Sequence, residues 1–279
     1  MRLSDSCAEC MYRRQKEKND NKEYLAEVKE LLDHREEVAS SPELVLEFNL
    51  LQKKYFGNTP SYKEINKKYN DLVLSMEDGL REKIQTSKDP LATAIVMSRI
   101  GNYIDFGAMN TVEEDTFIDL FKETAMREDE LKTYESFCKH CSEGKKFLLF
   151  TDNCGEVVLD KLMLEELEKK FPHLEITVMV RGGEVLNDAT LSDAEYIGMT
   201  KKYKVITSGV KMPGTVYRRV SSEAKKAIDE ADVILSKGQG NYEGFAGEGI
   251  PAFYAFLCKC DLFVNRFEVP RLTGMFVEE

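Results

Sequence analysis

The residues best suited to chemistry lie just after two apolar runs of the sequence. Asp152 and Asn153 follow the run at 147–150, and Asp188 comes soon after the run at 176–180. In open parallel α/β sheets, ligands bind beyond the carboxyl ends of the strands, so we expect these side chains to converge on one pocket. Two carboxylates and an amide are hard oxygen ligands that suit Mg²⁺ or Mn²⁺. Such residues also cap helices and form turns, but their recurrence after successive strands favours a metal site.

A glycine-flanked loop follows a third apolar run and has the composition of an anion-binding site. Its backbone amides could enclose an anion with a lysine charge beside it. The loop has neither the Walker A spacing nor a dinucleotide-binding fingerprint, so a plain turn explains it equally well. Lys259, between two cysteines, could bring a second positive charge to a bound phosphate, although a solvent-exposed lysine is the alternative. The loop consists of Lys237, Gly238, Gln239, Gly240 and Asn241.

The chain has seven cysteines and three histidines, and these numbers argue against a disulfide-bonded protein and against some classes of hydrolase. An odd number of cysteines in a chain without a secretory signal favours reduced thiols or metal ligands over disulfides. Cys154 has no histidine near it in the sequence, and we interpret it as a bystander rather than a nucleophile. The scarcity of histidine also argues against Ser-His-Asp hydrolysis. The pairs Cys7/Cys10 and Cys138/Cys141 have the spacing of zinc half-sites, so a structural zinc and chance proximity are both open, and the roles of Cys258 and Cys260 are not assigned.

Composition excludes several kinds of partner. The 279 residues are 42% hydrophobic, which is enough for a substantial core of a globular protein. With 39 basic and 50 acidic residues, the net charge of −11 argues against a sequence-independent grip on nucleic acid. No window approaches the roughly 18 to 20 apolar residues of a membrane span. The N-terminal sequence lacks the apolar core of a secretory signal, so we expect a cytoplasmic protein that does not bind membranes.

The chain divides by pattern into a helical part, residues 1–145, and an α/β part, residues 146–279. Short β-branched runs alternate with amphipathic segments in the second part, which indicates βαβ units and a parallel sheet. No low-complexity linker separates the parts, so we expect the helices to pack on the sheet. Helix start and stop signals predict helices that begin near Ser40, Thr59 and Asp89, and a fourth across residues 112–140. The strands are expected at 147–150, 176–180, 205–207, 233–235 and 260–264, with helices at 156–171 and 221–231.

Several motifs occur in one order along nearly the whole chain. They are Cys7-x-x-Cys10, Gly101-Asn102 with Asp105, Asp152-Asn153-Cys154-Gly155-Glu156, Asn187-Asp188-Ala189-Thr190, Ser208-Gly209 with Pro213-Gly214-Thr215, the loop Lys237 to Asn241 with Glu243, and Cys258-Lys259-Cys260. The ordered set resembles the metal-dependent damage-control phosphatase family, formerly known only as a domain of unknown function. The two cysteine motifs at the ends resemble its stand-alone microbial branch in particular.

The resemblance implies a three-layer α/β/α sandwich with a mainly parallel, Rossmann-like sheet and an all-helical N-terminal domain. It also implies hydrolysis of phosphate monoesters of small, often damaged metabolites, with Mn²⁺, Co²⁺, Ni²⁺ or Mg²⁺ as cofactor. In relatives a proline usually precedes the segment of Asn187, and its absence from residues 181–186 leaves the shape of that surface open. The family's metal ligands correspond to Asp152, Asn153 and Asp188. Its phosphate and substrate contacts correspond to Lys237, Gly238, Gln239, Gly240, Asn241 and Lys259, and Lys259 is also expected to be catalytic. We expect Asn102, Asp105, Glu156 and Asn187 to contact the substrate as well, although helix-end capping explains residues 101–105 equally well.

The residues and the resemblance agree on a mechanistic hypothesis. A metal ion on the three oxygen ligands would bind the phosphoryl group, while Lys237, Lys259 and the loop amides stabilise its developing charge. Whether water attacks directly or Asp152 attacks covalently stays open, although Cys154 stands where a haloacid-type enzyme has its second aspartate. Two other classes stay open, an S-adenosylmethionine-dependent carboxyl methyltransferase and a non-catalytic metal- or ligand-binding protein. The sequence does not predict the physiological substrate or the oligomeric state.

Overall fold

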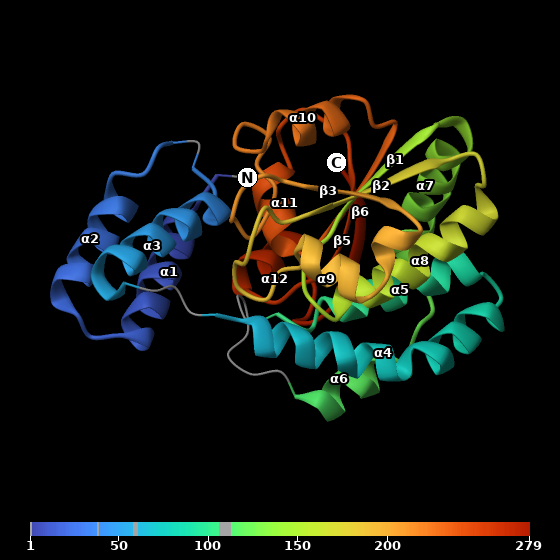
Figure 1. Ribbon diagram of the computed structural model, residues 1–279, viewed down its shortest axis with the longest axis horizontal. Coiled ribbons are helices and arrows are strands. Elements are labelled where there is room, and N and C mark those ends of the chain that lie inside the picture. The colour runs from blue at the N-terminus through green and yellow to red at the C-terminus, as the bar shows by residue number, and fades with distance from the viewer. Residues whose placement is uncertain (1, 38, 58–60, 106–112) are drawn as a thin grey trace.

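A six-stranded sheet covered by helices forms the body of the protein (Figure 1). The structure is a computed structural model, and it describes residues 2–37, 39–57, 61–105 and 113–279. None of the described helices is both long and apolar enough to cross a bilayer. The helices are α1 (Asp5–Lys18), α2 (Lys22–Asp33), α3 (Ser41–Phe56), α4 (Lys63–Gln85), α5 (Pro90–Gly101), α6 (Glu114–Leu120), α7 (Leu131–Glu143), α8 (Glu156–Lys170), α9 (Leu191–Tyr196), α10 (Ser222–Asp229), α11 (Gln239–Phe245) and α12 (Asp261–Phe267). The strands are β1 (Lys146–Phe150), β2 (Glu175–Val180), β3 (Lys204–Thr207), β4 (Val233–Lys237), β5 (Phe253–Leu257) and β6 (Gly274–Glu278), and two 3₁₀ helices are η1 (Glu128–Glu130) and η2 (Met199–Lys201).

The order of the strands locates a binding edge. The sheet runs β3-β2-β1-β4-β5-β6, with β1 to β5 parallel and β6 antiparallel to β5. The chain winds outward from β1 in one direction and from β4 in the other, so the winding reverses between these two neighbours. In doubly wound sheets, ligands bind beyond the carboxyl ends of the strands at this switch point. Residues 151–153 leave β1 there, and Gly238 leaves β4.

Helices cover both faces of the sheet, as the ribbon diagram shows (Figure 1). Leu149 of β1 packs with apolar residues of α4, α5, α7, α8 and α9 on one face. Leu148 and Phe150 point to the opposite face and pack with residues of α10, α11 and α12. This alternation is the period of a strand with both faces buried, which parallel sheets require. The predicted α/β/α sandwich with a mainly parallel sheet is confirmed.

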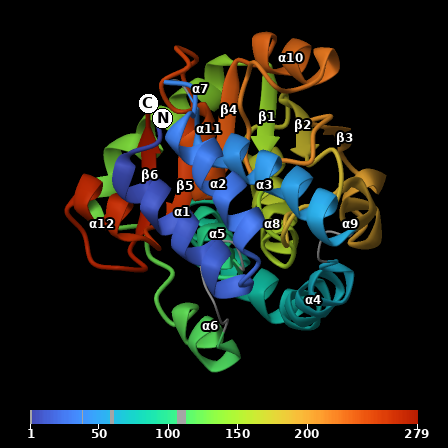
Figure 2. The same ribbon diagram turned by 90° about the vertical axis from the view of Figure 1, so that its left-hand side faces the viewer.

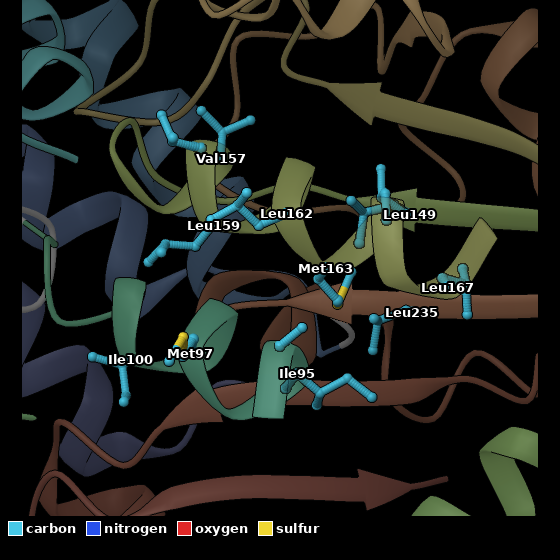
Figure 3. Close-up of a cluster of buried hydrophobic side chains, with 14 of the residues drawn as sticks. Ile95, Met97, Ile100, Leu149, Val157, Leu159, Leu162, Met163, Leu167 and Leu235 are labelled. Carbon is cyan, nitrogen blue, oxygen red and sulfur yellow. The ribbon is translucent and has the colours of Figure 1, made fainter. Parts of the chain in front are cut away.

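Helix α5 crosses α8 closely and thereby brings a loop to the binding edge. Ten of its residues, from Leu91 to Gly101, are buried, because the segment is apolar on nearly every side. Figure 3 shows α5 beside α8, and the two helices belong to one buried apolar cluster. A Cβ on Gly101 would lie 2.8 Å from the Cα of Glu156, so only glycine allows this approach. The crossing sets Asn102, the next residue, beside the end of β1.

Helices α1 to α3, residues 5–56, form a separate lobe that we call the cap. Tyr24, Val28, Leu44 and Phe48 form its own apolar cluster. The cap lies to one side of the body in Figure 1 and in front of the sheet in Figure 2. Helix α3 begins with a capping interaction, in which the Ser40 N–H donates to the carboxylate of Glu43 at 3.1 Å.

The apolar core does not divide where the sequence pattern changes. The predicted parts meet at residue 145, but α4, α5 and α7 share one apolar cluster with the sheet. Ile95 of α5 and Phe137 of α7 belong to the same cluster as Leu149 of β1. The lobe with its own cluster is therefore the cap, whereas α4, α5 and α7 belong to a helical layer of the body.

Two predicted elements were wrong. Residues 260–264 are not the last strand but the start of α12, with Cys260 as the N-cap. The apolar, β-branched composition favoured a strand there, but the aspartate in the first turn suits a helix. Strands β5 and β6, which flank this helix, were missed. The predicted helix across 112–140 is three pieces, α6, η1 and α7; its first residue lies outside the described part, as do Thr59 and Pro60.

Candidate active site

The two predicted acidic segments meet directly at the end of β1. Asn153 and Asp188 form an isolated antiparallel bridge. The Ala189 N–H donates to the Asp152 carbonyl oxygen at 2.7 Å, and the Cys154 N–H donates to the Asn187 carbonyl oxygen at 2.8 Å. Segments 35 residues apart in the chain are thus joined by their backbones. The three predicted metal ligands lie together, as the sequence analysis expected.

Arg181, which the sequence analysis did not select, holds the two carboxylates. Its Nε donates to Asp188 Oδ2 at 2.5 Å, and its Nη2 donates to Asp152 Oδ1 at 3.1 Å. Its Nη1 donates to Asn241 Oδ1 at 2.9 Å, and only 1% of the residue is exposed. Because the guanidinium fork is planar and rigid, it fixes three acceptors at once. The sequence signal for this role was its position directly after β2, at the same edge of the sheet.

Two carboxamides orient the other side of Asp152. Asn102 Nδ2 donates to Asp152 Oδ2 at 2.9 Å and to Glu156 Oε2 at 3.0 Å. Asn153 Nδ2 donates to the same two oxygens at the same distances. The Leu257 N–H in turn donates to Asn102 Oδ1. Both oxygens of Asp152 are therefore held by protein donors, and its carboxylate is fixed in orientation.

Burial and like charges act against ionisation of the carboxylates. Burial, then the charges of Asp188 and Glu156, raise the pKa of Asp152 well above its ordinary value, and Arg181 only partly opposes them. Burial likewise raises the pKa of Asp188 to about 6, and the guanidinium of Arg181 acts in the opposite direction. A single arginine does not compensate this acidic cluster. A further cation would lower the electrostatic cost of keeping both carboxylates charged.

The donor set fits a divalent cation with a preference for oxygen. Asp152, Asn153 and Asp188 all line the large cavity at this edge. Within the described residues, neither Asp188 Oδ1 nor Asn153 Oδ1 accepts a hydrogen bond, so each has its lone pairs available. Among the described residues, no three His, Cys, Asp or Glu side chains are placed to share a metal ion. The set at this edge is of another kind, because it has two carboxylates and one amide. Cys7, Cys10 and Cys260 line the cavity, whereas Cys138 and Cys141 lie on α7.

The cavity lies between the cap and the carboxyl edge of the sheet and has a volume of about 1120 Å³. In Figure 2, α1 and α3 lie in front of this edge. Its walls come from both lobes, since α1 and α3 contribute as many residues as the body does. The predicted site residues that line it are Asp105, Asp152, Asn153, Asp188, Gln239 and Gly240.

Lys237, predicted to bind phosphate, lies behind the cavity. Its side chain is fully buried, and its Nζ donates to Glu156 Oε1 at 2.7 Å and to Asp160 Oδ1 at 2.6 Å. Burial lowers the pKa of Lys237, but the two carboxylates outweigh burial and raise it. Burial raises the pKa of Asp160 to about 6, and Lys237 acts against that shift. The lysine supports Glu156, which accepts hydrogen bonds from the carboxamides that hold Asp152.

The glycine loop shapes the site by the absence of side chains. Gly238 has a φ of +80°, and a Cβ there would lie 1.9 Å from Asp152 Oδ2. Its N–H belongs to the sheet, since it donates to the Ala255 carbonyl oxygen, and so it does not serve an anion as predicted. Asn241 also acts as a scaffold, because its Nδ2 donates to the carbonyl oxygens of Thr151 and Lys237. Gln239 and Gly240 are the loop residues at the cavity surface.

Lys259 is not the exposed lysine that the simplest interpretation allowed. Its side chain is fully buried and forms an ion pair with Asp105, which lines the cavity. Its N–H donates to Gln239 Oε1 at 3.0 Å. Asn187 has a related role, since its Nδ2 donates to the carbonyl oxygen of Ile104 at 2.8 Å. Both residues hold the segment that carries Asp105 against the site.

Known proteins are similar to this chain in sequence and in fold. The family model described as the damage-control phosphatase ARMT1-like domain matches residues 3–273. A damage-control phosphatase of Archaeoglobus fulgidus is 30% identical over 208 residues, which cover 74% of this chain and 71% of that protein. An uncharacterised protein of Methanocaldococcus jannaschii is 32% identical over 219 residues, covering 75% and 70%. A crystal structure of a DUF89 family protein from Pyrococcus horikoshii matches 99% of both chains, with a TM-score of 0.78 and 23% identity, which shows the fold. The chain therefore belongs to the damage-control phosphatase ARMT1-like domain family.

Proposed function

We propose that this protein is a divalent-metal-dependent phosphatase that hydrolyses phosphate monoesters of small metabolites in the cytoplasm. The observation that carries the proposal is the convergence of Asp152, Asn153 and Asp188 on one cavity at the switch point of the sheet. Relatives of this chain are named damage-control phosphatases, which supports a phosphate ester as the substrate. All seven cysteines are free thiols in the structure, which is consistent with a reducing compartment.

The protein's own residues would hold the metal and the substrate in a fixed arrangement. Asp152, Asn153 and Asp188 would provide the ligands, and Arg181 keeps the two carboxylates at a constant separation. A divalent ion bound there would polarise a phosphoryl oxygen and balance the charge of the transition state. The missing side chain of Gly238 keeps the protein from crowding Asp152.

The hydrogen bonds of Asp152 favour attack by water over attack by this carboxylate. Its Oδ1 accepts from Arg181, and its Oδ2 accepts from Asn102 and Asn153. A nucleophile that must rotate toward phosphorus would have to break these bonds within a buried site, where unmade hydrogen bonds are costly. We therefore assign Asp152 the role of a ligand, and a water molecule the role of nucleophile.

The experiment is a metal and substrate panel on chelator-treated protein. Release of inorganic phosphate is measured from p-nitrophenyl phosphate and a set of sugar phosphates, with Mn²⁺, Co²⁺, Ni²⁺ or Mg²⁺ added singly. We expect release only with metal, and an Asp188→Asn variant that loses at least about 10³-fold in kcat/KM. Asp229→Asn, an exposed residue on α10, is the control with the same change of charge.

The same panel separates the other two classes. A methyltransferase would transfer a methyl group from S-adenosylmethionine to a carboxylate in the presence of chelator and would release no phosphate. A non-catalytic protein would bind a metal ion without any turnover. Phosphate release that persists in chelator, or that survives Asp188→Asn at full rate, would refute the metal site proposed here.

A further inference from the structure

The two walls of the large cavity carry opposite charge. On the body side, the lining includes Asp105, Asp152, Glu184, Asp188 and Glu243, with Lys211 as the one base among the described residues. On the cap side, the lining includes Arg14, Lys18 and Lys53, and within the described residues it includes no aspartate or glutamate. The protein as a whole is acidic, with a net charge of −11. A cap wall without acids therefore departs from the overall charge balance.

The cap itself is not a basic lobe. It has exposed acidic residues on its other surfaces, such as Glu23 and Glu30 of α2. The helix dipole favours cations in the last turns of α1 and α3, where Lys18 and Lys53 lie. However, Lys16 shares the last turn of α1 and does not line the cavity. The dipole explains the position of these cations along the helix, but it does not explain why the face toward the cavity lacks acids.

Two of these cations have no carboxylate partner among the described residues. Neither Lys18 nor Lys53 forms a salt bridge there. Arg14 and Lys18 are four residues apart on α1, a spacing at which like charges repel. Although Lys18 is exposed at the cavity wall, the surrounding protein and the charge of Arg14 lower its pKa. An anion between the walls would remove this repulsion.

We propose that the cap recognises a second anionic group, so that the preferred substrates are phosphate monoesters whose leaving group carries a carboxylate or another phosphate. This inference rests on the proposed function, in which the body side binds the phosphoryl group. The far end of such a substrate would meet Lys18 and Lys53 on the opposite wall. The cavity, about 1120 Å³, slightly exceeds the roughly 300–1,000 Å³ of typical small-molecule sites, so it has room for a substrate that spans both walls.

The experiment compares substrates that differ mainly in the second charge. With the full-length, metal-loaded protein, kcat/KM is measured for 3-phosphoglycerate against glycerol 3-phosphate, and for fructose 1,6-bisphosphate against fructose 1-phosphate. The first pair tests a carboxylate and the second a phosphate. The variant is Lys18→Gln/Lys53→Gln, and the control is Lys16→Gln/Lys22→Gln, which removes the same charge from exposed positions outside the cavity. Arg14 is left unchanged because its charge also acts on Glu243.

We expect the wild type to prefer the doubly anionic member of at least one pair. The variant should lose about tenfold on that substrate, mainly through KM, and less than about twofold on its partner, as for two exposed charge contacts. The preference should shrink as salt is added. Equal losses on both members would overturn the proposal, because the lysines would then only balance the acidic wall. Equal kcat/KM values for the two members of each pair in the wild type would also overturn the proposal for the cap. The proposed phosphatase activity would not be affected by that result.

A binding measurement keeps the two proposals separable. If no ester is hydrolysed, the proposed function fails, and the rise in Tm caused by 3-phosphoglycerate is compared with that caused by glycerol 3-phosphate. A larger rise for 3-phosphoglycerate that disappears in Lys18→Gln/Lys53→Gln would retain charge recognition by the cap. Equal rises in Tm, or none, would remove it.

Discussion

Two buried polar clusters lie beside the end of β1, and they differ in whether their charged side chains reach the cavity. We call the cluster that reaches it open and the other closed. The open cluster consists of Asp152, Asn153, Asp188 and Arg181, and its oxygens face a cavity. The closed cluster consists of Ser98, Glu156, Asp160 and Lys237, and every side chain in it is fully buried. Hydrogen bonds from Asn102 and Asn153 connect the two through Glu156.

This difference distinguishes buried charges that can bind a ligand from buried charges that only stabilise the fold. In the closed cluster one ammonium lies against two carboxylates, and among the polar side-chain atoms of this cluster only Asp160 Oδ2 has no hydrogen-bond partner. In the open cluster one guanidinium also lies against two carboxylates, but both carboxylates line a cavity of ligand size. Both clusters contain ion pairs, yet only the open one offers oxygen atoms to a bound ion.

The largest predicted effect separates the clusters by activity and stability. Lys237→Met should lower the free energy of unfolding by about 3–5 kcal/mol, because it leaves two buried carboxylates without their cation. Asp188→Asn should leave stability unchanged or raise it, because it removes one of the crowded charges, while kcat/KM falls at least about 10³-fold. Urea denaturation and phosphate release measure the two quantities.

A second variant tests whether Lys237→Met acts through charge. In Lys237→Met/Asp160→Asn, one of the stranded charges is gone, so part of the lost stability should return, by about 1–2 kcal/mol. If Lys237→Met instead folded as stably as the wild type and lost only activity, then Lys237 would belong to the open cluster, as the sequence first suggested.

The next largest effect is expected at Gly238, which lies beside Asp152 of the open cluster and directly follows Lys237 of the closed one. Gly238→Ala introduces a Cβ that would meet Asp152 Oδ2 at 1.9 Å, so the carboxylate must move. Displacing a ligand through its neighbour typically costs about 10–100-fold in metal affinity or activity, and we expect that loss here. Metal titration and phosphate release provide the measurements.

Gly247→Ala is the matched control for backbone strain. Gly247 has a φ of +88°, similar to the +80° of Gly238, but a Cβ there would meet nothing within 4 Å. Both variants should lose about 1–3 kcal/mol of stability from the strained backbone, and only Gly238→Ala should lose activity. Equal activity in the two variants would show that Asp152 tolerates the displacement.

The sequence predicted the open cluster better than the closed one for a physical reason. Asp152 and Asp188 follow strands, and parallel strands bring their ends to one edge whatever the side chains around them do. Lys237 is the last residue of β4, where every residue is buried, so no alternation of polar and apolar residues indicates which way its side chain points. Its partners Glu156 and Asp160 lie on α8, and only the packed structure shows that they face it.

Other parts of the site depended on long-range packing in the same way. Arg181 was missed because its role comes from three acceptors supplied by separate segments. The burial of Lys259 depends on Asp105, which is far from it in the chain. The misassigned strand at 260–264 reflects composition alone, because a short apolar run has no period that distinguishes a strand from a helix.

The smallest predicted effect concerns an ion pair that is neither fully buried nor part of the open cluster. Glu43 of the cap is buried and accepts hydrogen bonds from Arg218 and Arg219 of the body, whose side chains are partly exposed. Burial works to raise its pKa, but the two arginines and the Ser40 N–H outweigh burial and lower the pKa from 4.5 to about 2. Because the folded-state pKa lies below the ordinary value, this group stabilises the fold above pH 4.5, and the contribution is lost as the pH falls toward 2.

Glu43→Gln should therefore lower the free energy of unfolding by about 1–2 kcal/mol at pH 7, where the charged hydrogen bonds are lost. The difference between variant and wild type should shrink steadily below pH 4.5, since protonation then gives wild-type Glu43 the same neutral charge as glutamine. Hydrogen exchange of the α1 to α3 amides at several pH values measures the effect locally, with Glu30→Gln on the exposed side of α2 as control. A difference that stays constant with pH would mean that the charge of Glu43 does not hold the cap to the body.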